Sequence, residues 1–355
     1  MNSLLPLSRG ALSLLSVTIG LLFATLPAKG QTQRVSDIDR RIAPRTQFQK
    51  PIAWEVGDHT FLFEGTSLAG TQYLFDFDPG TPGIGRDHFD LYYAGVYDLR
   101  ISRKMANTLT YGVNTRLLTS GIAGSEATEG RFDVYLRGIW GQVSYGDFDD
   151  RDTLVLSARN SLAGEANLFY DGFVNTSPSR AFRYRARYSS FLVDAAVDDD
   201  GRNYNAGFLY RSPHETVKRA WSFDYHGGDL YGRYARNGVT FGHMLTYGSW
   251  DITAGVSWDH LDPYAGFNSF DRISGSIGTG YKWGRTAVGA GLLVAETGGG
   301  DLEYGATAGF RYDFSRGFSF NAGYLYLDSN SLGTDGLPVT AGQLSGIRTS
   351  FSYRF

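Results

Sequence analysis

The chain has 355 residues, a formal net charge of −3 and no cysteine, and Phe, Tyr and Trp make up 15% of it. This aromatic content is too high for a disordered chain, and the lack of cysteine excludes disulfides, thiolate nucleophiles and Cys-ligated metals. The slightly acidic pI, near 6.1, argues against nucleic-acid binding. A mean hydropathy of −0.24 excludes a protein built from membrane-spanning helices.

The first 30 residues have the organisation of a secretory signal. One basic residue precedes an apolar run over 11–26, and a small-x-small cleavage pattern over 28–30 precedes Gln31. We predict a cleaved signal peptide over 1–30 rather than a membrane anchor, because the run is short and interrupted by Gly20 and Pro27. We expect the polar segment 31–50 to be a flexible start or a periplasmic tether, and 51–355 to form one domain.

From about His59 onward, apolar and polar residues alternate. Between Phe89 and Ile101 every second residue is apolar or small, and Asp90, Asp98 and Arg100 have the opposite parity. The same period of two returns along the chain and is typical of strands with two different faces. No stretch beyond the signal is apolar for the roughly 20 residues that a spanning helix needs. A membrane-embedded chain of this kind must therefore close into a barrel.

The predicted connections are of two lengths. Short ones fall at 140–141, 189–190, 248–249 and 283–284, and long polar ones at 119–129, 148–179, 260–270 and 328–342. This asymmetry predicts an all-β, transmembrane antiparallel β-barrel of about 16 strands. The alternative, a soluble β-sandwich, would have fewer strands and would not carry Tyr and Phe on its outward positions. Tryptophans near strand ends are candidates for an interfacial girdle: Trp54, Trp140, Trp221, Trp250, Trp258 and Trp283.

Two runs resemble the general porins of Gram-negative bacteria. Residues 131–146, RFDVYLRGIWGQVSYG, are similar to the hairpin before the constriction loop of that family, and 312–316 and 351–355 are similar to its last strands. Asp147 stands where many porins carry Arg. The resemblance implies an outer-membrane homotrimer whose third outer loop folds into the pore. It also implies that Phe351, Tyr353 and Phe355 form the C-terminal signal read by the outer-membrane assembly machinery.

Arginines are predicted to line the pore. Arg183, Arg185 and Arg187 alternate with apolar residues in one predicted strand, and because lipid does not tolerate arginine, these side chains must face the lumen. Arg100, Arg116 and Arg137 share the inward parity on neighbouring strands. The alternative is that lumen faces are simply polar and that these arginines pair locally. A basic wall at the narrowest point favours anions.

The longest predicted loop, 148–179, follows the fifth predicted strand and is rich in acids. We predict that it folds inward as a constriction loop and faces the arginine wall, so that a transverse field crosses the gap. Its acidic candidates are Asp149, Asp150, Asp152, Glu165 and Asp171.

No cofactor or metal site is predicted. The run Asp198-Asp199-Asp200-Gly201 offers clustered carboxylates that could hold a divalent cation bridging lipopolysaccharide, or it could be a solvated turn.

The predicted function is passive diffusion of small hydrophilic solutes and ions through an outer-membrane channel in contact with lipid and lipopolysaccharide. A substrate-specific channel is the nearest alternative. A barrel enzyme would need a histidine beside an acid or serine, as in Asp224 and His226, or Asp259, His260 and Asp262. A structural barrel would not conduct. We expect no enzyme activity and no nucleic-acid partner.

Overall fold

The computed structural model describes residues 51–75, 88–105, 108–122, 125–148, 154, 156, 180–212, 217–230, 234–264, 268–298, 301–315, 317–329 and 342–355. The predicted signal peptide and the polar segment 31–50 lie outside these residues. None of the helices in the described part of the chain is long and apolar enough to cross a membrane.

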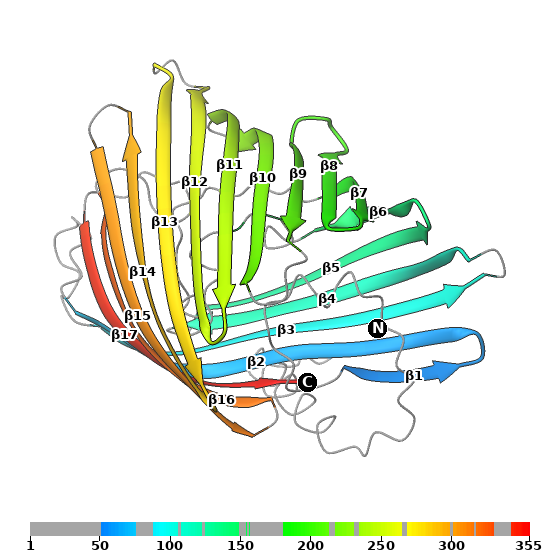
Figure 1. Cartoon of the computed structure of the whole chain (residues 1–355), viewed down its shortest axis with the longest axis horizontal. Coiled ribbons are helices and arrows are strands. Elements are labelled where there is room, and N and C mark those ends of the chain that lie inside the picture. The colour runs from blue at the N-terminus through cyan, green and yellow to red at the C-terminus, as the bar shows by residue number, and fades with distance from the viewer. Residues whose placement is uncertain are drawn as a thin grey trace, which may run out of the picture.

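Antiparallel strands close into a barrel. Each strand pairs with the next along the chain, and β17 pairs with β2, so that β2 to β17 form a closed ring of 16 strands. The predicted all-β barrel of about 16 strands is confirmed. In Figure 1, β10–β14 and β2–β5 run across each other as opposite walls, because strands in a barrel are tilted against its axis. The strands are β1 (Ile52–Val56), β2 (His59–Phe75), β3 (His88–Lys104), β4 (Thr110–Ile122), β5 (Ser125–Gly138), β6 (Gly141–Asp147), β7 (Arg180–Tyr188), β8 (Phe191–Asp198), β9 (Tyr204–Arg211), β10 (Val217–Leu230), β11 (Tyr234–Tyr247), β12 (Trp250–Pro263), β13 (Phe270–Trp283), β14 (Thr286–Thr297), β15 (Asp301–Ser315), β16 (Phe318–Ser329) and β17 (Gly342–Arg354).

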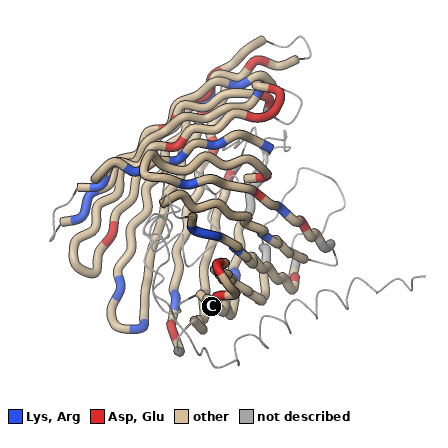
Figure 2. Tube along the Cα trace, turned by 90° about the vertical axis from the view of Figure 1, so that its right-hand side faces the viewer, with Lys and Arg blue, Asp and Glu red and all other residues tan. Residues whose placement is uncertain are grey.

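The barrel is apolar outside and polar inside. Phe182 on β7 is 57% exposed and Leu292 on β14 is 57% exposed, whereas Arg272 on β13 is fully buried. Charged residues lie along the strands as well as at their ends (Figure 2). This is the reverse of a soluble protein, because the outer face is suited to lipid and the inner face to water.

The predicted girdle tryptophans all have exposed side chains. Trp250 begins β12, Trp283 ends β13 and Trp140 lies in the turn between β5 and β6, so these three lie at strand ends. Trp221 and Trp258 lie farther along their strands.

The first and last strands of the domain, β1 and β17, pair with different parts of the same strand, β2. β17 pairs with β2 as far as Arg354 opposite Thr66, and Phe355 exchanges two backbone hydrogen bonds of 3.0 Å with Gly65. β1 then pairs with the remaining part of β2, with Ile52 opposite Phe63. Because both strands are antiparallel to β2, β1 continues the line of β17.

The short connections match the predicted positions, but two long ones differ. The predicted loop over 260–270 is shorter, because β12 extends to Pro263 and β13 begins at Phe270. Gly248 and Gly284 have φ values of +56° and +55° in two of the short turns, a conformation that glycine adopts without strain. The predicted long loop over 119–129 is wrong, because this stretch is a hairpin in which Leu118 pairs with Glu129 and Ile122 with Ser125. The prediction took the polar residues of this stretch as a sign of a loop. Strands of such barrels can extend beyond the apolar band and are polar there.

Candidate functional site

Two arginines of β7 share one carboxylate of β8 inside the barrel. Arg183 Nε donates to Asp194 Oδ1 at 2.8 Å, and Arg185 Nη2 donates to Asp194 Oδ2 at 2.7 Å. Arg183 is 6% exposed and Asp194 is 1% exposed. The three side chains together carry one net positive charge, so Asp194 partly balances the two arginines; a basic wall at the constriction stays a prediction.

Arg100 and Arg116 also face the lumen and have partners in the wall. Arg116 Nε donates to Asp98 Oδ1 at 2.6 Å, and Arg100 Nε donates to Asn114 Oδ1 at 2.9 Å. Asn114 in turn donates to Asp133 Oδ2 at 2.8 Å. These contacts link β3 to β4 twice and, through Asn114, link β4 to β5, which is the local pairing that the sequence left open.

Arg137 and Arg187 lie close to the short turns. Arg137 Nε donates to Gln142 Oε1 at 2.9 Å, and its guanidinium lies 5.4 Å from the ring centre of Tyr135. Arg187 is exposed and donates to the backbone oxygen of Ser189 at 3.1 Å. The structure therefore places Arg187 at the rim, away from the Arg183–Asp194 pair.

The acidic candidates of the predicted constriction loop, Asp149, Asp150, Asp152, Glu165 and Asp171, lie outside the described residues. Two leucines from the same segment are described, and both contact the inner wall. Leu154 and Leu156 are buried in a cluster with Leu192 of β8 and Leu209 of β9. The Leu156 amide donates to Ser222 Oγ of β10 at 2.9 Å. This part of the segment between β6 and β7 therefore lies inside the barrel.

The start of the same segment is also held inside. The backbone oxygen of Phe148 accepts a hydrogen bond of 2.8 Å from Arg131 of β5, and the Arg183 guanidinium lies 5.2 Å from the centre of the Phe148 ring. Phe148 is buried with Ala181 and Ala196, which belong to β7 and β8. The predictions missed Phe148, Leu154 and Leu156, although apolar residues in a polar loop could have indicated such anchors.

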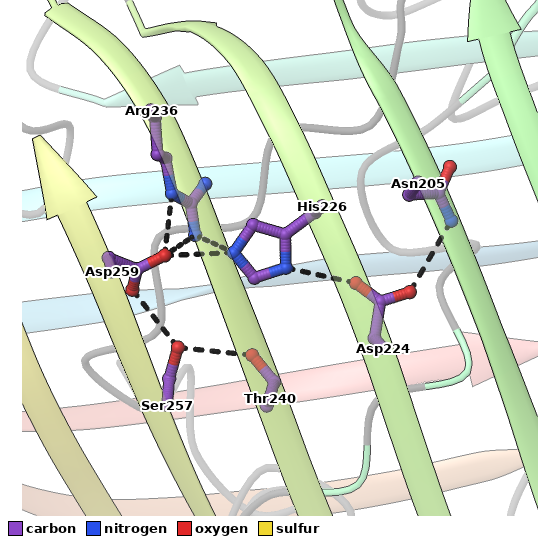
Figure 3. A network of polar contacts seen from close by, with 7 residues as sticks. All are labelled: Asn205, Asp224, His226, Arg236, Thr240, Ser257 and Asp259. Atoms are coloured by element: carbon purple, nitrogen blue, oxygen red, sulfur yellow. Dashed lines mark hydrogen bonds and ion pairs between the residues drawn. The ribbon is translucent and has the colours of Figure 1, made fainter.

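A second polar network crosses β9 to β12 (Figure 3). His226 lies between two carboxylates, with Nδ1 3.0 Å from Asp224 Oδ2 and Nε2 2.8 Å from Asp259 Oδ1. Arg236 Nε donates to Asp259 Oδ1 at 2.7 Å, and Arg236 Nη2 lies 2.6 Å from His226 Nε2. All four side chains are almost fully buried.

Hydroxyl and amide groups complete this network. Ser257 Oγ donates to Asp259 Oδ2 at 3.0 Å and accepts from Thr240 Oγ1 at 3.0 Å. Asn205 Nδ2 lies 3.5 Å from Asp224 Oδ1. The arrangement links polar side chains of four neighbouring strands, β9 to β12.

Of the two histidine groups considered as hydrolytic sites, His226 lies 3.0 Å from Asp224 and His260 lies 3.5 Å from Asp262, but Asp259 does not join His260. Asp259 joins His226 and Asp224, whereas His260 points the other way and lies 2.7 Å from Asp271 at an exposed position. The Ser257 hydroxyl donates its hydrogen bond to Asp259 rather than to His226. The predictions missed Arg236, because its place beside His226 depends on the register between β10 and β11, in which Arg236 lies opposite Gly228.

The carboxylates of the acidic turn are engaged by protein donors. Asp198 accepts from the backbone amides of Arg202 and Asn203 at 2.7 and 3.0 Å, and Asp199 accepts from the Tyr145 hydroxyl at 3.1 Å. Within the described residues there is no group of three His, Asp or Glu side chains that could hold a metal ion.

No protein-family model matches the chain, and neither does any curated protein sequence. Solved structures match over most of it. The anion-selective porin from Comamonas acidovorans aligns with a TM-score of 0.64 and 14% identity, covering 84% of this chain and 100% of its own. The chain has the porin fold.

Two further solved structures show the same porin fold. OmpT, an outer-membrane protein of Vibrio cholerae, aligns with a TM-score of 0.62 and 12% identity, covering 85% of this chain and 99% of its own. Another structure described as a porin aligns with a TM-score of 0.54 and 14% identity, covering 83% of this chain and 100% of its own.

In this porin fold the predicted C-terminal signal residues lie in the closing strand. Phe351 is exposed on the outer face and stacks on Phe318, with ring centres 5.8 Å apart. Phe355 is buried, with its ring 5.2 Å from that of Phe63. Recognition of these residues by the outer-membrane assembly machinery stays a prediction. Because Phe355 is buried in the closed barrel, the machinery would have to bind it before the barrel closes.

Gly238 of β11 allows the His226 network to lie flat against the wall. A Cβ atom at this position would be 2.2 Å from Asp259 Oδ1 and 2.6 Å from His226 Nε2. We expect Gly238→Ala to lower the free energy of unfolding by about 1–3 kcal/mol, because the buried charged groups must move apart. The measurement is urea unfolding in lipid vesicles, and Gly275→Ala, where the nearest atom is 3.9 Å from the new Cβ, is the matched control. Equal stability of the two variants would contradict this role.

Proposed function

We propose that this chain is an outer-membrane porin, a water-filled channel through which small hydrophilic solutes and ions diffuse passively. The observation that carries the proposal is the charged inner wall with Leu154 and Leu156 held against it. A barrel of this size is wide enough for an aqueous lumen, and a segment lying inside narrows it. The porin-like neighbours support an outer-membrane location.

Selectivity at the constriction is set by local charge in this proposal. Arg183, Arg185 and Asp194 together carry one net positive charge, so anions are favoured near them. The acidic residues predicted on the loop between β6 and β7 would face this wall and orient polar solutes in the gap.

The first experiment is single-channel conductance in a planar bilayer with a salt gradient. Stable ohmic steps support a diffusion channel. Conductance that saturates with one solute would favour a substrate-specific channel. Correctly folded, heat-modifiable protein that never conducts would overturn the proposal in favour of an enzyme or a structural barrel.

The arginine pair provides a sharper test. Arg183→Gln combined with Arg185→Gln leaves Asp194 as the charged group of this cluster and changes its net charge from positive to negative. We expect the reversal potential to move toward cations, because fixed charge at a narrow point governs ion preference more than distant, screened charge. An unchanged reversal potential would remove these residues from the constriction.

We further propose that the protein is a homotrimer that contacts lipid and lipopolysaccharide. One neighbour, OmpT of Vibrio cholerae, has a structure described as a trimer form. On the outer face of this chain, hydroxyl pairs join β17, β2 and β3: Thr71 with Thr349 at 2.8 Å and Ser67 with Tyr97 at 2.7 Å. Small and hydroxyl side chains are typical of protein–protein contacts inside membranes. Channel closure in three equal steps is the expected signature.

A further inference from the structure

Arg348 of β17 faces the lumen and is held by neutral groups. Its neighbour Ile347 is exposed on the outer face, so Arg348 points inward. Its Nε donates to the Oε1 atom of Gln72, a buried residue that lies opposite on β2. The guanidinium lies 5.6 Å from the ring centre of Tyr92 on β3. An amide oxygen and an aromatic ring fix the guanidinium in place, but neither supplies a negative charge to balance it.

Other arginines of the inner wall are paired with carboxylates. The described salt bridges of this kind join Arg116 to Asp98, Arg183 and Arg185 to Asp194, Arg236 to Asp259, Arg272 to Glu303, and Arg311 to Asp313. Arg348 has no carboxylate partner in the part of the chain that the structure describes. Its charge is permanent, because a guanidinium does not lose its proton in proteins. It therefore attracts anions from a water-filled lumen.

The wall beside Arg348 offers no competing acid. On β16 it lies opposite Gly323, which in turn lies opposite Gly309 of β15. Neither glycine has a side chain that could cover the guanidinium. On the other side, the register continues through Gln72 to Asp90 of β3, about 10 Å from Arg348 along the wall because two strand spacings separate them.

The free edge of this guanidinium suits an oxyanion. Of its five N–H donors, the one on Nε is used by Gln72. Neither Nη atom has a hydrogen-bond partner among the described residues. Two parallel N–H groups of arginine match two oxygens of a carboxylate or a phosphate, which chloride cannot reproduce.

We propose that Arg348 is an anion subsite of the lumen that binds a small oxyanion, such as phosphate or a carboxylate, on its Nη edge. The inference deepens the proposed channel function and rests on it for its role in transport. Gln72 and Tyr92 position the guanidinium. The subsite is separate from Arg183 and Arg185, because β2 to β6 lie between β17 and β7.

The test is binding of inorganic phosphate to the folded protein in detergent at constant ionic strength, followed by broadening of the phosphorus NMR signal. Arg348→Gln should weaken binding by roughly 10-fold or more, because charge-assisted hydrogen bonds are lost. Gln72→Glu keeps Arg348 but places a carboxylate beside it, so it should weaken binding similarly. Heat modifiability shows that each variant is folded.

Arg103→Gln is the matched control, because it also removes one positive charge but lies at an exposed position, paired with Asp58 at 2.8 Å. It should leave phosphate binding unchanged. Binding by Arg348→Gln or Gln72→Glu that equals binding by this control would overturn the proposal, and so would a lack of binding by the unsubstituted protein.

Conductance in a planar bilayer separates this inference from the channel function. If the protein never conducts but its phosphate binding depends on Arg348, the channel function fails and the subsite stands. If it conducts and its phosphate binding does not depend on Arg348, the subsite fails and the channel function stands.

Discussion

Asp194→Ala is expected to be among the most destabilising single substitutions in the barrel wall. It removes the carboxylate that Arg183 and Arg185 share and leaves two guanidinium groups close together on one face of β7. Breaking a buried ion pair by removing one partner typically costs about 3–5 kcal/mol. The measurement is the free energy of unfolding by urea in lipid vesicles.

The same substitution should move ion preference toward anions, opposite to the effect of Arg183→Gln with Arg185→Gln. Asp200→Ala in the exposed turn after β8 is the matched control, and a surface change of this kind stays within about 0.5 kcal/mol. If Asp194→Ala matches that control in both the free energy of unfolding and the reversal potential, the prediction is wrong. Water rather than Asp194 would then stabilise the charges of Arg183 and Arg185.

Gly242→Ala is expected to release the inner segment from the wall. Gly242 of β11 faces Leu156, and a Cβ atom there would be 2.2 Å from the Leu156 backbone oxygen and 2.8 Å from its Cβ. Alanine is compatible with the extended backbone of a strand. The added methyl group therefore disturbs only the contact with Leu156. Overpacking costs about 1–3 kcal/mol, which corresponds to roughly 5- to 150-fold more of the detached form.

Detachment is measured by the rate of proteolytic cleavage between β6 and β7 in the folded protein, since that rate follows the population of the open form. The hydrogen bond from Leu156 to Ser222 should be lost at the same time, and the channel should become noisier and close at a lower voltage. Gly275→Ala again serves as control. A cleavage rate equal to that of the control would mean that Leu156 does not anchor the segment.

The two networks of the lumen share one physical principle. Asp194 accepts hydrogen bonds from two guanidinium groups, and Asp259 accepts one from Arg236, so that opposite charges of aspartate and arginine meet across neighbouring strands. Such groups keep fixed positions along the wall while the pore stays polar. In the proposed channel, a wall of this kind would orient passing ions without binding them tightly, as passive diffusion requires.

The sequence by itself determined the type of fold and the inward face of residues such as Arg183 and Arg185. The period of two identified strands, and lipid excludes Arg183 and Arg185 from the outer face, so their inward direction followed without a structure. The same local pattern could not distinguish a loop from a hairpin over 119–129, because polar residues occur in both.

Only the tertiary structure decided which side chains meet. Asp194 joins Arg183 and Arg185, and Asp259 joins His226, because strand register sets these neighbours and a shift of one residue would turn each side chain to the other face. The contact of Leu156 with Gly242 and the meeting of β17 with β1 link residues far apart in the chain. Such contacts depend on barrel closure, which no local sequence pattern encodes.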